Sequence, residues 1–172
     1  MPFIGVFGII ISVSLKKGEN MDTVDLKILK CLKEYSRMNA TAIGERINLS
    51  TSAVIERIKK LENDGVISQY TILISHEKIE KDIIAYISVS LEHPKFDSDF
   101  RDMVRKNEEI IECHYITGEY DYLLKVVTSS SKTLEIVLNY VKCIKGVNLT
   151  KTLVVMSTIK NEFSSLPIID EE

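Results

Sequence analysis

Residues in the first half of the chain show the hydrophobic spacing of amphipathic helices. Asp22 can cap a first helix, and Asp25, three residues later, favours the positive end of that helix. Apolar residues then recur at intervals of one helical turn, which predicts a helix with one buried face. They are Ile28, Leu29, Leu32 and Tyr35.

A second, shorter helix is predicted after a polar stretch. Asn39 or Thr41 can cap it, and Ile43 and Ile47 share one of its faces. The run Asn48-Leu49-Ser50 then forms a turn. A short connection of this kind between two helices is characteristic of a helix-turn-helix.

A third helix is predicted to begin after Ser50 and to end at Asn63-Asp64-Gly65. A rotation of about 100° per residue points its polar, mostly basic residues outward, with Arg57 at the margin. The next segment, Val66 to Leu73, is interpreted as a strand or small wing. The inward positions are Val54, Ile55, Ile58 and Leu61, and the outward positions are Ser52, Glu56, Lys59 and Lys60.

The outward stripe of the third helix suits the major groove of double-stranded DNA, where the N-terminal part of a recognition helix meets base edges. A generic helical subdomain with a solvated lysine face is the alternative. Glu56 can pair with Lys60 one turn away or accept a hydrogen bond from a cytosine amino group. The predicted DNA-binding residues are Ser50, Thr51, Ser52, Arg57, Lys59 and Lys60.

The second half of the chain mixes period-two alternation with helical spacing. The predicted elements are a strand at 83–91, a helix around 96–104, strands at 110–117 and 122–127, a helix capped by Ser130 or Ser131, and a strand at 147–159. This β-α-β-β-α-β order predicts a ferredoxin-like domain, with a four-stranded antiparallel sheet and two helices on one face. The fold class expected for the whole chain is therefore α+β.

The face of that sheet without helices would carry Tyr86, Leu123 and further apolar side chains. A partner subunit commonly buries an uncovered apolar face of this kind. The pattern therefore predicts a homodimer.

Charge supports DNA binding only weakly. The chain has 172 residues, 45% of them hydrophobic and 27% charged, which is ordinary for a globular protein. Its net charge is −3, yet residues 22–68 hold eight Lys and Arg against seven Asp and Glu, whereas residues 69–172 hold 12 against 17. The slightly basic first half is the expected place for a DNA-binding domain.

Few residues suit an enzyme or a metal centre. The three cysteines are widely spaced and odd in number, which argues against a disulfide framework or zinc finger and fits a reducing, cytoplasmic setting. Cys113 and His114 are adjacent in a predicted strand, so their side chains point to opposite faces. His76 and His93 lack ligand-spaced partners. We therefore predict no catalysis, metal or cofactor; an effector-binding protein that acts through protein contacts is the second hypothesis, and an enzyme is a more remote one.

Residues 1–20 differ in character from the rest. Met1 to Leu15 is almost wholly apolar, but it lacks the basic start and cleavage site of a signal peptide and is short for a transmembrane helix. Codons for Lys16-Lys17-Gly18-Glu19-Asn20 can contain a purine-rich ribosome-binding site, which favours translation from Met21. The alternative is a short membrane anchor whose following lysines keep the remainder cytoplasmic.

With both halves in place, the chain resembles the Lrp/AsnC (feast/famine) family of transcription regulators across residues 22–168. The matching runs lie in the first helix, in the third helix and, most sharply, around the turn before Tyr122. They are Asp22 to Asp25, Ile28 to Leu32, Leu49-Ser50, Arg57 to Ile67, Glu108 to His114, Thr117 to Lys125, Gly146 to Asn148, Val154 to Met156 and Leu166 to Ile168.

The resemblance implies a winged helix-turn-helix, a hinge, and an αβ domain that senses a ligand, dimerises and assembles into octamers or similar rings. It also implies an amino acid bound between dimers near a Gly-x-(Tyr/Phe)-Asp turn. A carboxylate at this turn can neutralise an α-ammonium, and backbone N–H groups around Gly118 can hold an α-carboxylate. The residues expected there are Thr117, Gly118, Glu119, Tyr120, Asp121 and Leu123, with Thr152, Val154 and Met156 as neighbours from the last strand.

Some roles stay open at this point. Asp121 could instead bond the turn backbone, and Tyr120 could pack in an interface. The third helix begins Ser50-Thr51-Ser52-Ala53 where many relatives have prolines, and Glu56 replaces a frequent basic residue, so the operator cannot be transferred. Leu153 stands where a leucine-sensing member has an aromatic residue, which leaves the effector open.

The sequence thus predicts a DNA-binding regulator whose effector, an amino acid, shifts its assembly and so the number of recognition helices that engage DNA. The expected domains are an apolar extension at 1–20, a winged helix-turn-helix at 21–68, a hinge at 69–82, an effector-binding and oligomerisation domain at 83–168, and an acidic tail at 169–172.

Overall fold

A computed structural model describes residues 21–162 and 164–167, and it divides the chain into two compact units. Within the described residues, one unit comprises 21–71 with 162 and 164–167, and the other comprises Ile72–Asn161. The C-terminal segment joins the first unit because Lys33 Nζ lies 3.0 Å from Glu162 Oε2. The predicted extension at 1–20 and acidic tail at 169–172 lie outside the described residues.

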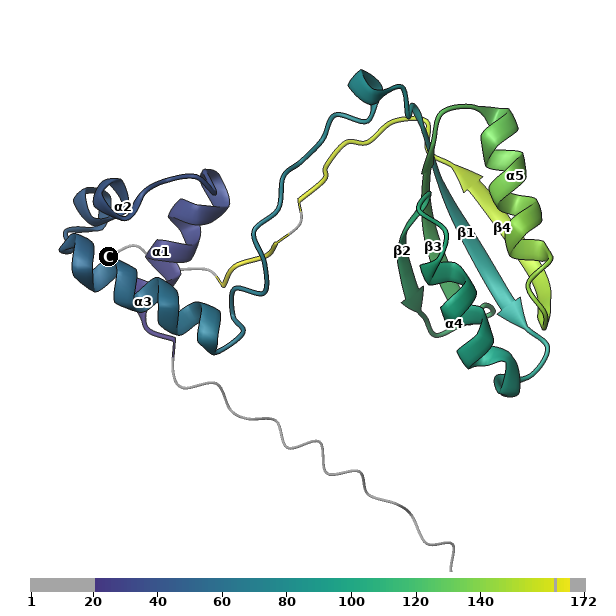
Figure 1. Cartoon of the computed structure of the whole chain (residues 1–172), viewed down its shortest axis with the longest axis horizontal. Coiled ribbons are helices and arrows are strands. Elements are labelled where there is room, and N and C mark those ends of the chain that lie inside the picture. The colour runs from purple at the N-terminus through teal and green to yellow at the C-terminus, as the bar shows by residue number, and fades with distance from the viewer. Residues whose placement is uncertain (1–20, 163, 168–172) are drawn as a thin grey trace, which may run out of the picture. The chain divides into compact units, whose positions relative to one another are not determined.

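The N-terminal unit is built from capped helices (Figure 1). They are α1 (Thr23–Glu34), α2 (Ala40–Ile47) and α3 (Thr51–Asn63). The side chains of Asp22, Asn39 and Ser50 each accept a hydrogen bond from a backbone N–H of the first turn that follows. The predicted helix-turn-helix and its caps are confirmed, with Asn39 rather than Thr41 capping α2.

A small apolar core holds these helices together. Its fully buried members come from all three helices, and Val54 and Leu61 contribute from α3. The prediction that Ile55 faces inward is wrong, since 41% of it is exposed. Ile55 lies about 100° around the helix from Val54, and α1 and α2 cover only the stripe through Val54 and Leu61. The core residues are Ile28, Cys31, Ile43, Val54 and Leu61.

The segment after α3, predicted as a strand or small wing between Val66 and Leu73, forms no strand. Gly65 adopts a φ of 72°, and the N–H groups of Val66 and Ile67 both donate to the carbonyl of Leu61. These bonds close the end of α3. Residues 66–73 have no strand partner within the described chain, so no β-ladder forms there.

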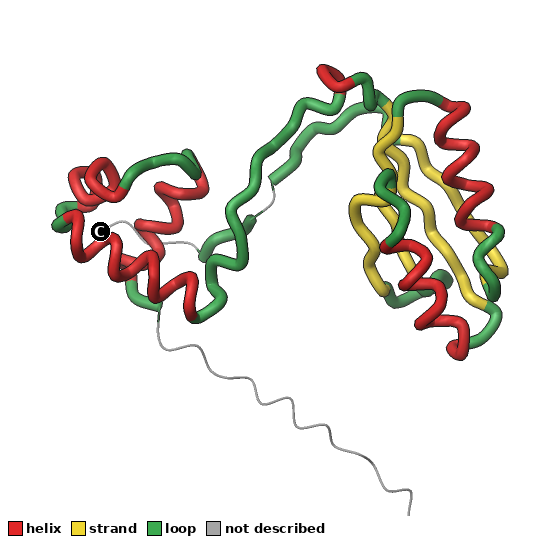
Figure 2. Tube along the Cα trace, viewed as in Figure 1, coloured by secondary structure: helices red, strands yellow, loops and turns green. Residues whose placement is uncertain are grey.

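The C-terminal unit contains the predicted β-α-β-β-α-β arrangement (Figure 2). The described sheet is antiparallel with strand order β2-β3-β1-β4, which confirms the ferredoxin-like prediction. Short 3₁₀ turns at Glu77–Ile79 and Pro94–Phe96 flank the first strand. The elements are β1 (Ile83–Leu91), α4 (Asp97–Arg105), β2 (Ile110–Tyr115), β3 (Tyr122–Thr128), α5 (Ser131–Lys142) and β4 (Val147–Val154).

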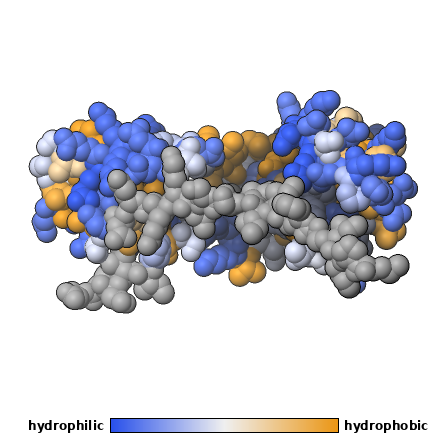
Figure 3. All heavy atoms as spheres, turned by 90° about the horizontal axis from the view of Figure 1, so that it is seen from below, coloured by the Kyte–Doolittle hydropathy of each residue, from blue (hydrophilic) through white to orange (hydrophobic). Residues whose placement is uncertain are grey.

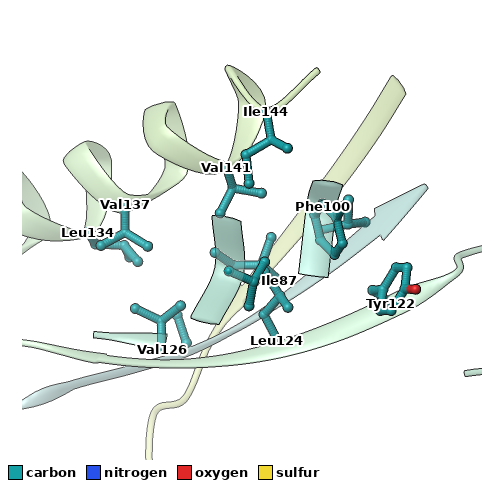
Figure 4. Close-up of a cluster of buried hydrophobic side chains, with 12 residues drawn as sticks. Ile87, Phe100, Tyr122, Leu124, Val126, Leu134, Val137, Val141 and Ile144 are labelled. Atoms are coloured by element: carbon teal, nitrogen blue, oxygen red, sulfur yellow. The ribbon is translucent and has the colours of Figure 1, made fainter. Parts of the chain in front are cut away.

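One face of this sheet packs against α4 and α5. Figure 4 shows Leu134, Val137 and Val141 of α5 directed at the strands, with Phe100 of α4 beside them. Alternate residues of β1 and β3 meet these helices, as the period of a strand requires. The sheet side of the core comprises Ala85, Ile87, Val89, Tyr122, Leu124 and Val126.

The last strand ends earlier than predicted. β4 stops at Val154, whereas the sequence is rich in β-forming residues as far as Ile159. Val155 still donates to the carbonyl of Ile84, but β1 begins at Ile83. Beyond that point no neighbouring strand remains to pair with, so β-propensity alone does not extend the sheet.

The opposite sheet face is open, and we define it by Tyr86, Leu123, Leu149 and Leu153. Tyr86 pairs with Leu153 across the strands, and Ser88 pairs with Leu123, so these residues point away from the buried Ala85, Ile87 and Val89. Leu149 and Leu153 are exposed. Figure 3 shows that apolar side chains interrupt the hydrophilic surface of the molecule. Every helix within residues 21–162 is too short or too polar to cross a membrane.

Candidate functional site

Hydroxyl groups gather at the start of the recognition helix α3. Ser50 Oγ accepts from the N–H of Ala53 and lies 3.1 Å from Ser52 Oγ. Thr51 Oγ1 donates to Thr41 Oγ1 over 3.4 Å, which links α3 to α2. Ser50, Thr51 and Ser52 are all exposed. These short polar side chains suit contacts with phosphates or base edges at the N-terminal end of a recognition helix.

The outer side of α3 carries charge. Glu56, Lys59 and Lys60 are exposed, as the helical period predicts. Ile55 lies on the margin of the same surface and adds an apolar group that could contact a thymine methyl. The surface is therefore mixed rather than strongly basic.

Arg57 is directed away from this outer side. Its Nη1 lies 2.7 Å from Asp22 Oδ2 and 2.7 Å from Asp25 Oδ1, at the N-terminus of α1. These hydrogen bonds raise the pKa of the guanidinium above its usual value, Asp25 having the larger effect. The structure therefore shows Arg57 in a contact between helices, whereas the sequence placed it at the margin of the outward stripe and among the predicted DNA-binding residues.

The turn between β2 and β3 is held by Asp121. Gly118 adopts a φ of 125°, which favours glycine. The N–H of Asp121 donates to the carbonyl of Val89, and Asp121 Oδ2 accepts from the N–H of Leu91 over 2.7 Å. The Asp121 carboxylate therefore fixes the turn to the end of β1 through Oδ2. Its other oxygen, Oδ1, is the one that could bind a ligand.

A cavity of about 380 Å³ opens beside this turn. Arg101 of α4 lines it, with Nε 2.9 Å from the Tyr122 hydroxyl and 2.9 Å from Asp97 Oδ2. Tyr122 also donates to Asp97, and burial followed by this bond raises the pKa of the Tyr122 phenol. Both charge signs thus line one small space. The lining residues are Leu91, Pro94, Asp97, Arg101, Tyr115, Asp121 and Tyr122.

Sequence reasoning did not identify Arg101 and Asp97 as candidate site residues. Their spacing of four residues in α4 was the available signal, because oppositely charged side chains so placed meet on a helix surface. That signal is common on solvated helices and does not by itself indicate a site. The pair becomes a candidate for ligand binding only because α4 lies beside the turn and places Asp97 and Arg101 in the wall of the cavity.

The structure does not bring all predicted effector residues together within one chain. Asp121 contacts Leu91 at one end of β1, whereas Val154 pairs with Ala85 towards the other end. Six residues of strand span about 20 Å. Thr117, Gly118 and Glu119 are exposed at the turn, whereas Leu123 lies on the open sheet face and Met156 is 93% exposed beyond β4. The turn and the last strand therefore form two separate clusters.

Nucleophile and metal chemistry finds no support in the described residues. Cys113 pairs with Leu124 and His114 with Leu123, so their side chains lie on opposite faces of the sheet. Burial raises the pKa of the Cys113 thiol, which disfavours the reactive thiolate. No group of three His, Cys, Asp or Glu residues in the described part of the chain could hold a metal ion.

Two protein families match the two units separately. Residues 21–68 match a winged helix-turn-helix DNA-binding family, and residues 84–164 match the Lrp/AsnC ligand-binding domain. The leucine-responsive regulatory proteins of Klebsiella pneumoniae and Escherichia coli are each 32% identical over 148 residues, which cover 84% of this chain and 90% of theirs. The chain belongs to the Lrp/AsnC family. It is a transcription regulator, not an enzyme, with a DNA-binding domain followed by a ligand-binding domain.

Solved structures of Lrp/AsnC regulators share this architecture. A transcriptional regulator from Neisseria meningitidis, solved in complex with L-Met, is 34% identical with a TM-score of 0.81, over 86% of this chain and 97% of that one. The feast or famine regulatory protein of Mycobacterium tuberculosis, complexed with L-methionine, is 25% identical with a TM-score of 0.80, over 86% and 100% of the two chains. AsnC of E. coli shares the fold at 22% identity, with a TM-score of 0.79 and coverage of 85% and 99%.

Proposed function

We propose that this regulator binds an α-amino acid beside the turn at residues 117–121, and that the bound amino acid changes its oligomeric assembly and its hold on DNA. The carrying observation is the cavity next to Asp121, where Arg101 and two carboxylates present both charge signs. A zwitterion needs this combination. A volume of about 380 Å³ lies within the range of small-molecule sites.

The relatives support an apolar amino acid as the effector. The N. meningitidis and M. tuberculosis regulators were solved with L-Met. In this chain Leu91, Pro94 and Tyr115 line the cavity together with the charged groups, and they would contact an apolar side chain.

A second protomer would complete the site. Thr152 pairs with Ile87 near the middle of β1, Val154 pairs with Ala85 further from the turn, and Met156 lies beyond β4, so we expect these residues to meet the ligand from another copy of the chain. The open sheet face supplies a surface for a homodimer, and contacts between dimers at the turn would build a ring such as an octamer. The DNA-binding domain and the free cysteines support a cytoplasmic setting for the proposed assembly.

Effector binding is tested with the twenty standard amino acids. We expect one or more apolar amino acids to raise the melting temperature of the intact protein and to change its sedimentation coefficient. Asp121→Asn keeps an acceptor for the Leu91 N–H but loses the negative charge, and should weaken binding about ten- to a hundredfold. Asp102→Asn is the control, because that carboxylate pairs with Arg105 on the exposed side of α4. If no amino acid alters melting or sedimentation, the effector proposal fails.

DNA contact by α3 is tested with salt. Lys59→Ala and Lys60→Ala should each reduce the slope of log Kd against log salt by about one, and together weaken binding roughly tenfold, because each lysine releases counterions from a phosphate. Electrophoretic mobility shift of the protein's own promoter fragment at several salt concentrations measures both quantities. Lys132→Ala removes the same charge from α5 and should change neither. An unchanged slope in both α3 variants would remove these lysines from the interface.

A further inference from the structure

Arg57 joins the recognition helix to the first turn of α1. Its Nη1 contacts Asp22 and Asp25, which lie 35 and 32 residues earlier in the chain. The Asp25 side chain is only 5% exposed, whereas that of Asp22 is 48% exposed. A buried carboxylate requires a partner, and Arg57 supplies it from α3.

The four oxygens of the two carboxylates are divided between two tasks. Asp22 Oδ1 accepts from the N–H of Asp25 over 2.8 Å, and Asp25 Oδ2 accepts from the N–H of Asp22 over 3.3 Å, which forms the capping box of α1. The other oxygens, Asp22 Oδ2 and Asp25 Oδ1, receive Arg57. The Asp25 backbone bond, with a smaller contribution from Arg57, lowers the pKa of Asp22. The start of α1 is thus a preformed receptor for one guanidinium.

The apolar core holds α3 along one narrow stripe, and Arg57 adds a polar contact on the flank of that stripe. Val54 and Leu61 of α3 are fully buried and Ile58 packs against the same core, whereas Ile55 lies exposed on one flank of that stripe. Burying Ile55 would be favourable by itself, and a rotation of α3 in that direction would carry the lysines away from the DNA-facing side. Arg57 lies on the other flank, about 160° from Ile55 by the helical period, and ties that flank to α1.

We propose that Arg57 is a positioning residue for DNA binding, which sets the rotation of α3 by inserting into the carboxylate receptor of Asp22 and Asp25. It does not contact bases. The inference starts from the DNA-binding activity of the family and assigns a role that acts through α3 rather than on DNA. The two acidic residues belong to the DNA-binding apparatus for the same reason.

The direction in which DNA affinity changes when either aspartate is replaced distinguishes this role from simple electrostatics. Asp25→Asn and Asp22→Asn each remove a negative charge from a DNA-binding domain, which by charge alone should tighten DNA binding. The positioning role predicts the opposite, a loss of about tenfold, because Arg57 loses part of its receptor. Glu34→Gln is the matched control: Glu34 pairs with Arg46 on the exposed surface of the same unit, and its removal should leave affinity equal or slightly higher.

Two controls separate the effect of the aspartate substitutions on folding from their effect on DNA affinity. Asp22 is half exposed, so Asp22→Asn leaves no buried charge unpaired and should fold. Val54→Ala lowers the stability of the same core without touching the receptor, and at a temperature where every variant is folded it should bind DNA more tightly than Asp22→Asn or Asp25→Asn. Circular dichroism melting and amino-acid binding check the folded state of each full-length variant.

Salt dependence and coupling complete the test. Arg57→Gln should weaken binding to the promoter fragment without changing the slope of log Kd against log salt, whereas loss of a phosphate contact would reduce the slope by about one. Arg57→Lys should be intermediate, since an ammonium keeps the positive charge but lacks the planar, rigid geometry of the guanidinium. The Arg57→Gln/Asp25→Asn double variant should be no weaker than Arg57→Gln alone. Tighter binding by both aspartate variants, or a slope reduced by one in Arg57→Gln, overturns the proposal.

Discussion

Replacing Gly44 with alanine should destabilise the DNA-binding unit and weaken DNA binding, although alanine is the better helix former. A Cβ at Gly44 would lie 2.5 Å from the carbonyl oxygen of Leu49, and the N–H of Leu49 donates to the carbonyl of Gly44 over 2.9 Å. Backbone atoms of the turn cannot rotate aside as a side chain can. We expect a loss of about 1–3 kcal/mol, which lowers the melting temperature of this small unit by roughly 5–20 °C.

Gly65→Ala is the matched control for Gly44→Ala. It lies in the same unit at a φ of 72°, but no atom within 4 Å meets its Cβ. Its cost should be about 1 kcal/mol from the left-handed backbone alone. Melting by circular dichroism and mobility shift on DNA measure both variants, with amino-acid binding as the check on the C-terminal unit. A higher melting temperature for Gly44→Ala would show that α2 and the turn are not packed as described.

Placing a charge on the open sheet face should dissociate the proposed homodimer. Leu153 is 55% exposed, pairs with Tyr86, and has Lys151 two residues away on the same face. In a two-fold dimer, Leu153→Lys adds two cations to a surface that already carries Lys151 from each protomer. We expect the dimer dissociation constant to rise at least a hundredfold, because unpaired charges in an interface cost several kcal/mol. Sedimentation equilibrium of the purified protein measures it.

DNA affinity should fall with the loss of the dimer. Two linked recognition helices gain roughly 10²–10⁴ in avidity over one, so monomeric Leu153→Lys should bind a two-site operator weakly. Ile136→Lys is the control, since Ile136 is 62% exposed on α5, away from the sheet face. It should keep the dimer. If Leu153→Lys sediments as the unaltered protein does, the subunits associate through another surface.

Features that depend on neighbouring residues were predictable from the sequence. A cap needs only a side-chain oxygen two or three residues before the N–H that it accepts from, so Asp22, Asn39 and Ser50 were all identified in advance. Strand alternation in β1 was equally clear, because each side chain's face follows from its parity. The βαββαβ order followed from these local signals.

Features that depend on distant partners were not predictable in the same way. The helical period treats Arg57 as a marginal residue, and nothing local indicates that Asp22 and Asp25 receive it. The helical period also does not show that Val54 is buried and Ile55 exposed, because the positions of α1 and α2 decide which of the two is covered. The segments at 66–73 and 155–159 have strand composition, but a strand exists only where another strand supplies its hydrogen bonds.

The candidate effector site illustrates both cases. The turn at Gly118 to Asp121 was visible as a motif, and its backbone geometry agrees with a tight connection. The sequence could not show that Asp121 would bond the end of β1 or that α4 would bring Arg101 beside it. The antiparallel register, not the order of residues, separates Val154 from the turn.

The contact of the C-terminal segment with the N-terminal unit affects how chimaeric regulators should be designed. Glu162 pairs with Lys33, so the described segment from Glu162 onward groups with the N-terminal unit, although the match to the ligand-binding family runs to residue 164. A chimaera that exchanges sensors while keeping the same operator specificity therefore needs two junctions, one near residue 71 and one near residue 162. A fluorophore at Ser165 would likewise travel with the recognition helix rather than with the sensor.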